Sequence, residues 1–348
     1  MKRLVYLDVL RGVAILLMVT DHAFDWWLDS AGNAGPWGRW TEFAGTLAAP
    51  LFLFLVGIGM ALSSRLAERK GKPRPDVVIH FLRRGALLFL SGYLLNLLIF
   101  YTGSNSQDIW SVDVLHTIGL SIIFMIPLLW QPAPVILVVF ISLFVFGQTA
   151  GEWDLPKWLE PFLTAGYFPL ALWLPYACFG LAFGKFFDVG GLRKQDAFLL
   201  LALSLLSFAL IPLVDPAWGY RHPRPIFFLF SIAVLLLITV VSWTWTERLS
   251  SRGPLVRFLQ VMGQTSLMLY VFHHLVGYRL FWLFGWVRGR SWRGEYGIFT
   301  PLQAAWLFLI LLILMALFSN WWLKQRVLSR LAARVRRVVS IKEIITGV

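Results

Sequence analysis

Residues 3–28 read RLVYLDVLRGVAILLMVTDHAFDWWL, an apolar run long enough to cross a lipid bilayer. Spacings of three and four residues separate Asp8, Arg11, Ile15, Met18, His22 and Asp25. This spacing places all of them on one face of a helix. Charged groups at bilayer depth are costly and persist mainly where they face a bundle interior or an aqueous cavity. The stretch therefore predicts a membrane helix that carries a functional site.

The composition of the whole chain agrees with a membrane protein. Of its 348 residues, 58% are hydrophobic and only 14% are charged, and the mean hydropathy is +0.71. These values predict an all-α, polytopic membrane bundle. Apolar runs near the length needed to cross the bilayer predict about ten spans. They lie at about 9–28, 43–63, 84–101, 112–130, 133–148, 166–187, 197–214, 226–245, 258–284 and 302–323.

The net charge of +13 is distributed unevenly over this topology. With the N-terminus inside, most of the 31 Lys and Arg fall on one side of the membrane. This positive-inside asymmetry predicts cytoplasmic termini in a multi-pass protein of the inner (plasma) membrane. The basicity then reflects topology and not nucleic-acid binding. We predict one transmembrane domain, residues 1–323, and a basic amphipathic tail, residues 324–348, on the bilayer surface.

Orientation converts sequence positions into depths. His22 follows Arg11 by three helical turns, about 16 Å along the axis. Arg11 is therefore expected near the cytoplasmic mouth and His22 in the outer half. Asp113 and His116 begin a span that runs inward, so they are expected at the depth of His22, on one face of their helix.

The span predicted at 258–284 carries Tyr270, His273 and His274 well along its outward course. Adjacent helical residues point about 100° apart, so only one of the two histidines is expected to face a shared cavity. His274, four residues after Tyr270, is the preferred one. Three helices thus bring histidines to a similar depth.

His22 is the leading catalytic candidate, because a neighbouring carboxylate can orient the ring of a general base. The residues expected to complete the catalytic group are Asp21, Asp25, Asp113, His116 and His274. A membrane histidine is also often a hydrogen-bonded packing residue, and for His116 that interpretation is equally strong. No metal is expected, since no known ligand spacing is present.

The cytoplasmic mouth holds a second group of charged residues. Arg83 and Arg84 open the third predicted span, and Arg11 follows Asp8 by three residues inside the first. Arg11 suits either an ion pair with Asp8 or a phosphate contact through its planar guanidinium. Arg83 and Arg84 suit phosphate binding and simple positive-inside anchoring about equally.

The run from Arg3 to Asp25 resembles the opening of the heparan-α-glucosaminide N-acetyltransferase catalytic-domain family of membrane acyltransferases. Later stretches agree with the family in order and spacing. They are APLFLFLVG at Ala49–Gly57, DVLHTIGLS at Asp113–Ser121, YFPLALWLPY at Tyr167–Tyr176 and GQTSLMLYVFHH at Gly263–His274.

The resemblance implies transfer of an acetyl group from cytoplasmic acetyl-CoA to an acceptor beyond the membrane, commonly a sugar or glycan hydroxyl or amine. His22 matches the family's histidine near the outer end of the first helix. The nucleotide of the donor would lie among Asp8, Arg11, Arg83 and Arg84. Tyr270, together with Trp173 and Tyr176 of the YFPLALWLPY stretch, is expected to bind the acceptor.

A proton-coupled transporter is the alternative from another class. Asp8, Arg11, His22 and Asp25, with Asp113 and His116, can form a relay of the kind that transporters use. A transporter of this kind often has two related halves, each with an interrupted hydrophobic segment. The sequence contains no such pair, so the acyltransferase is favoured.

Overall fold

Helices make up nearly all of the described chain. The computed structural model describes residues 4–100, 110–187, 192–214, 223–249, 253–278 and 297–325. Within these ranges, an isolated bridge between Leu28 and Phe299 is the only strand-like pairing. The first half forms α1 (Val5–Trp27), α2 (Ser30–Ala34), α3 (Pro36–Gly45), α4 (Ala48–Arg69), α5 (Arg74–Phe100), α7 (Val114–Phe124), η1 (Ile126–Trp130) and α8 (Ala133–Gln148).

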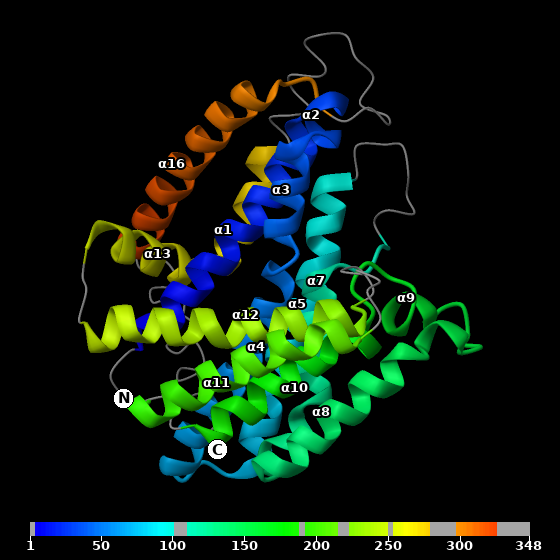
Figure 1. Cartoon of the computed structure of the whole chain (residues 1–348). Helices are drawn as coiled ribbons and strands as arrows, with labels where there is room; N and C mark the ends of the chain where they lie inside the picture. Colours follow the sequence, from blue (N-terminus) through cyan, green and yellow to red (C-terminus); the bar gives the residue numbers. More distant parts are fainter. Residues whose placement is uncertain are drawn as a thin grey trace, which may run out of the picture.

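The second half continues the helical pattern (Figure 1). Its elements are η2 (Ala150–Glu152), α9 (Glu160–Leu163), α10 (Leu170–Phe186), α11 (Lys194–Leu210), η3 (Ile211–Leu213), α12 (Pro225–Trp243), η4 (Thr244–Arg248), α13 (Pro254–Gln264), α14 (Ser266–His273), η5 (His274–Tyr278) and α16 (Pro301–Gln325). The prediction of an all-α protein is confirmed. The predicted tail lies outside the described residues from 326 onward.

Several helices are suited to cross a membrane. Among the described residues, 5 stretches are long and apolar enough: Pro36–Arg69, Arg74–Ile99, Lys194–Leu213, Pro225–Arg248 and Pro301–Gln325. The pair α13 and α14 makes a sixth if it is one span. Shorter apolar helices are Val114–Phe124, Ala133–Gln148 and Leu170–Phe186. The chain is therefore a helical membrane protein. The structure supports five or six spans among the described residues, fewer than the ten predicted from the sequence.

Helix α1 runs through the middle of the bundle (Figure 1) and packs against α3, α4, α12, α13, α14 and α16. Its first turn is held by Glu247, whose Oε1 accepts a 3.0 Å hydrogen bond from the backbone N–H of Val5. A carboxylate is favourable at this end of a helix dipole. At the other end, Trp27 Nε1 donates to the Gly277 carbonyl at 3.1 Å. Both ends of α1 are thus fixed to distant parts of the chain.

Helices α1 and α13 cross at very short range through two glycines. A Cβ on Gly12 would overlap the Leu259 carbonyl of α13, and one on Gly263 would overlap the Asp8 carbonyl of α1. Small residues at such crossings let two backbones approach, a common form of packing between membrane helices. This crossing fixes the position of α1 relative to the segment that carries the two adjacent histidines.

The segment predicted as one span at 258–284 is broken. Its axis turns by 80° between α13 and α14, and the last described turn, η5, is a π-helix. At the break, the hydroxyl of Thr265 shares a 2.8 Å hydrogen bond with Ser319 of α16. The span that was expected to be continuous therefore changes direction just before Tyr270, His273 and His274.

Candidate functional site

A cavity of about 360 Å³ opens beside the C-terminal half of α1. It is lined by Met18, Asp21, His22, Asp25, Trp26, Gly45, Thr46, Ala48, Ala49, Phe52, Asn96, Ile99, Ser111, Asp113, Val114, Tyr167, Phe168, Trp173, His274 and Tyr278. The lining combines aromatic rings with carboxylates and imidazoles. A concave site with a few convergent polar groups is the usual form of a small-molecule site.

His22 projects from α1 into this cavity and contacts both adjacent histidines. Its Nδ1 lies 3.0 Å from Nε2 of His273, within hydrogen-bond distance. Its ring centroid lies 5.2 Å from that of His274 and 5.3 Å from that of Trp26. His274 lines the cavity with His22, whereas His273 is fully buried behind it. Sequence analysis assigned no role to His273, although it is the direct partner of His22.

Two carboxylates next to His22 on α1 were expected to orient its ring. Asp21 and Asp25 line the cavity, and Nδ1 of His22 lies within hydrogen-bond distance of His273. The sequence led us to expect a neighbouring carboxylate to orient this ring, whereas the partner that the structure gives Nδ1 is another histidine.

Asp113 enters the cavity from the N-terminus of α7 and is held there by two other candidates. The hydroxyl of Tyr270 donates a 2.6 Å hydrogen bond to Asp113 Oδ2. Nδ1 of His116 accepts a 3.0 Å hydrogen bond from the Asp113 backbone N–H, which completes a capping box. The charge of Asp113 acts on both His22 and His274. Tyr270 and His116 thus position Asp113.

His116 lies outside the cavity lining and is completely buried. Its ring centroid is 4.2 Å from that of Tyr93 and 5.2 Å from that of Phe89. A Cβ on Gly92 would meet the same ring, so α5 needs a glycine at this point. The structure therefore supports the packing interpretation of His116, in which it caps α7 instead of touching substrate.

The predicted acceptor-binding residues also differ in whether they line the cavity. Trp173 lines the cavity, in edge contact with Phe168 at 5.0 Å between ring centroids. Tyr176 is buried away from it, and its hydroxyl shares a 2.8 Å hydrogen bond with Ser231 of α12. Tyr270 is likewise outside the lining. Of these three residues, Trp173 alone borders the cavity directly.

Asn96 and Ser111 are among the lining residues that were not predicted from the sequence. Asn96 of α5 donates a 2.9 Å hydrogen bond to the Ser111 carbonyl, and both residues line the cavity. A carboxamide within the apolar run at 84–101 was the available signal, since polar groups in membrane helices commonly mark contacts or sites.

The basic residues at the other end of α1 form a separate group. Arg11 Nη1 lies 3.0 Å from Asp8 Oδ1, the ion pair that the sequence spacing allowed. Gln264 of α13 also reaches Asp8, at 3.5 Å. Arg84 lies near enough to Arg11 for their charges to interact, and Arg83 and Arg84 are both exposed on α5. This group is about 16 Å along α1 from His22.

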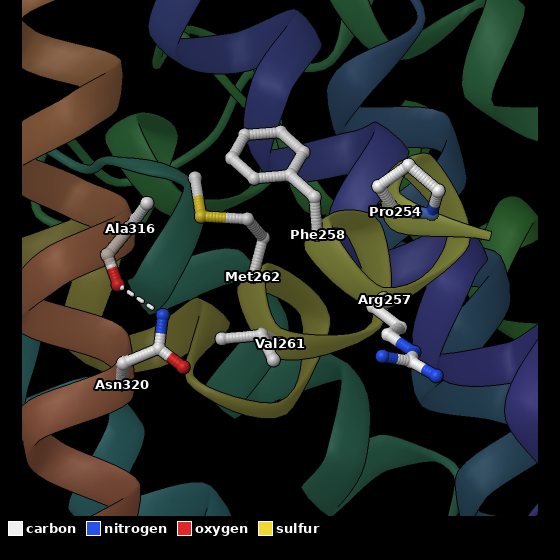
Figure 2. Close-up of a pocket in the computed structure, with 7 residues that line it drawn as sticks. All are labelled: Pro254, Arg257, Phe258, Val261, Met262, Ala316 and Asn320. Atoms are coloured by element: carbon white, nitrogen blue, oxygen red, sulfur yellow. Dashed lines mark hydrogen bonds between the residues drawn. The ribbon is translucent and has the colours of Figure 1, made fainter. Parts of the chain in front are cut away.

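A larger cavity, about 490 Å³, lies between α13 and α16 (Figure 2). Its lining is Pro254, Arg257, Phe258, Val261, Met262, Ala316 and Asn320. Figure 2 shows the Asn320 amide directed to the Ala316 carbonyl, a 2.8 Å hydrogen bond within α16. This mainly apolar lining contains no acid, base or nucleophile suited to group transfer. The cavity at His22 is therefore the candidate active site.

The described residues also contain a grouping that can hold a metal ion. His22, His273 and His274 each offer a ring nitrogen, and these atoms lie within 4.8 Å of one another. The ligands come from two distant segments, so no local spacing in the sequence pointed to them. Because Nδ1 of His22 and Nε2 of His273 already share a hydrogen bond, a proton and a metal would compete for the same nitrogens.

The chain matches a known protein family over more than half of its length. The family described as heparan-alpha-glucosaminide N-acetyltransferase, catalytic, matches residues 3–211. The matched region includes the whole of α1, the α7 segment with Asp113 and the stretch that contains Trp173. No curated protein matches the chain. The match covers more than half of the sequence.

Proposed function

Because the chain belongs to the heparan-alpha-glucosaminide N-acetyltransferase catalytic family, we propose that it is a membrane acetyltransferase whose active site is the cavity at His22. The donor is acetyl-CoA, and the acceptor is a sugar or glycan with a free hydroxyl or amine. The observation that carries this proposal is the position of His22. Its ring lines a cavity with Asp113 and His274, and both His22 and Asp113 lie within residues 3–211, the part of the chain that matches the family.

In the proposed topology about ten spans cross the inner membrane, with both termini in the cytoplasm. Arg11 then lies at the cytoplasmic mouth with Arg84, and their guanidinium groups bind the phosphates of the donor with help from Arg83. Asp8 holds Arg11 through their 3.0 Å ion pair. The pantetheine arm extends along α1, so that the thioester reaches His22 while the nucleotide stays at the mouth.

The proposed reaction uses His22 as a general base. Its imidazole takes the proton from the attacking hydroxyl or amine as that atom adds to the thioester carbonyl. The tetrahedral intermediate then collapses, the carbon–sulfur bond breaks, and the CoA thiolate leaves and takes the proton from the His22 imidazolium. The products are CoA and an ester or amide of the acceptor. Transfer through an acetyl-histidine at the same ring is a two-step form of this chemistry.

The rest of the cavity suits a sugar-like acceptor. Trp26 and Trp173 provide flat apolar surfaces, while Asp21, Asp25 and Asp113 can accept hydrogen bonds from hydroxyl or ammonium groups. Tyr270 and His116 contribute indirectly, because each holds Asp113 in place. No resident metal is part of this proposal.

The experiment is acetyl-CoA consumption by the purified protein in detergent, with and without amino sugars. Acceptor-dependent release of CoA supports the acetyltransferase. The proton-coupled transporter predicts substrate flux in proteoliposomes and no thioester cleavage. A protein that produces flux and leaves acetyl-CoA intact under all acceptor conditions would contradict the proposal.

A further inference from the structure

We propose that His273 is a positioning residue that fixes the tautomer of His22 and so leaves the lone pair of His22 on Nε2. This inference rests on the proposed function, in which His22 takes a proton from the acceptor. It concerns a histidine that lies behind the cavity and shares a hydrogen bond with the proposed base. Its basis is a continuous series of hydrogen bonds whose direction follows from elementary chemistry.

The series begins at a backbone carbonyl. Nδ1 of His273 lies 3.0 Å from the Leu269 carbonyl oxygen, one turn earlier on α14. A carbonyl oxygen only accepts, so Nδ1 of His273 must carry a proton and donate it. In a neutral imidazole the other nitrogen is then an acceptor, so Nε2 of His273 presents a lone pair toward α1.

The next hydrogen bond assigns the proton of His22. Its Nδ1 lies 3.0 Å from Nε2 of His273, which can only accept while His273 is neutral. Nδ1 of His22 therefore donates, and the lone pair of neutral His22 is on Nε2. Because Nδ1 is already bonded, Nε2 is the nitrogen free to receive the acceptor's proton. When it does so, the bond from Nδ1 to His273 persists without any rotation.

Ring contacts hold the side chains of His22 and His273 in place. The rings of His22 and His273 are inclined by only 24°, with centroids 5.3 Å apart, and Trp26 stacks on His273 at 5.8 Å. His274 repeats the first hydrogen bond, since its Nδ1 lies 2.9 Å from the Tyr270 carbonyl oxygen. Its Nε2 is likewise an acceptor in the neutral form. The break at Thr265 and the π-helical turn at 274–278 bring both adjacent rings to His22.

The test compares two substitutions at one position. The amide oxygen of His273→Gln lies near the position of Nε2 and still accepts a hydrogen bond, whereas the apolar side chain of His273→Leu does not. Without an acceptor, the proton of His22 is free to occupy either nitrogen. We expect kcat to fall about tenfold or more in His273→Leu and to stay within about threefold of wild type in His273→Gln. CoA affinity should change in neither.

The matched control is Phe272→Leu, which also replaces an aromatic ring by leucine at the position next to His273; the ring of Phe272 stacks on Phe318 of α16. Its turnover is expected to match wild type. Equal losses of turnover in His273→Gln and His273→Leu would show that the ring fills space and does not orient His22. Full activity in His273→Leu would overturn the proposal directly.

A spectroscopic test does not require turnover, so it separates this inference from the proposed function. The ¹⁵N chemical shifts of His22, measured by solid-state NMR in bilayers, should show a protonated Nδ1 and an unprotonated Nε2 in wild type and His273→Gln. In His273→Leu they should show a mixture. A protonated Nε2 in the wild type would contradict the proposal. One equivalent of bound metal that disappears in His273→Leu would also contradict it, because the metal would occupy the nitrogen assigned to the proton.

Discussion

The hydroxyl of Tyr270 donates a 2.6 Å hydrogen bond to Oδ2 of Asp113, which joins α14 to the N-cap residue of α7 across 157 positions of sequence. Tyr270→Phe removes this donor and leaves the ring in place. A hydrogen bond to a charged group contributes about 1.5–3 kcal/mol, so we expect a lower melting temperature in detergent. Turnover should also fall, because Asp113 loses its orientation.

A double-mutant cycle isolates that contact. Asp113→Asn keeps a side chain that can cap α7, since asparagine and aspartate are similarly effective at this position. If Tyr270 acts through Asp113, the double variant will lose less activity than the two single losses combined. Strictly additive losses would show that Tyr270 has a role independent of Asp113.

Trp173 and Tyr176 are expected to have separable effects. Trp173→Leu removes an aromatic wall of the cavity, so the KM for the acceptor should rise several-fold with little change in CoA affinity. Tyr176→Phe removes a buried hydrogen bond to Ser231. It should lower the free energy of unfolding by about 1 kcal/mol and leave the KM unchanged. Steady-state kinetics and thermal unfolding of both variants check this assignment, and a raised KM in Tyr176→Phe would refute it.

Arg11 and Arg84 are expected to bind the phosphates of CoA. Neutralising either one, as Arg11→Gln or Arg84→Gln, should weaken CoA binding about tenfold, which corresponds to about 1.4 kcal/mol. Arg39→Gln is the matched control, because Arg39 lies on α3, where its side chain donates to the Ala34 carbonyl. Calorimetric titration with CoA measures all three. Equal affinities in the Arg11, Arg84 and Arg39 variants would place the phosphates elsewhere.

The close crossing of α1 and α13 predicts a large effect from a small substitution. Gly12→Ala places a methyl group against the backbone carbonyl of Leu259. Forcing atoms into a packed contact typically costs about 1–3 kcal/mol, so a clear drop in melting temperature is expected. Gly59→Ala is the control, because a Cβ there has no neighbour within 4 Å. A melting temperature unchanged in both variants would argue against this crossing.

Sequence periodicity located much of the site. The charged face of α1 placed Asp25 and His22 together, and both line the cavity. The same spacing paired Asp8 with Arg11. These inferences hold because regular helical geometry relates residues that are close in sequence. The expected depth match between α1 and α7 also brought Asp113 to the cavity.

The contact between His22 and His273 lies next to an irregular part of the backbone, the bend at Thr265 and the π-helical turn at 274–278. His273 was set aside because adjacent residues on a straight helix point in different directions. The 80° bend at Thr265 redirects the whole segment that carries both residues, and in that segment His274 lines the cavity while His273 contacts His22 from behind it. Hydrophobic periodicity does not register such breaks, and π-helical turns often occur at functional sites.

The central claim is that His22 performs the chemistry and does not bind the donor. The most direct measurement is CoA affinity by calorimetry together with CoA release from acetyl-CoA, for wild type and His22→Ala in the same detergent. We predict equal CoA affinity in both proteins, with acceptor-dependent thioester cleavage in wild type only. Undiminished cleavage by His22→Ala, or no CoA binding by wild type, would contradict the account.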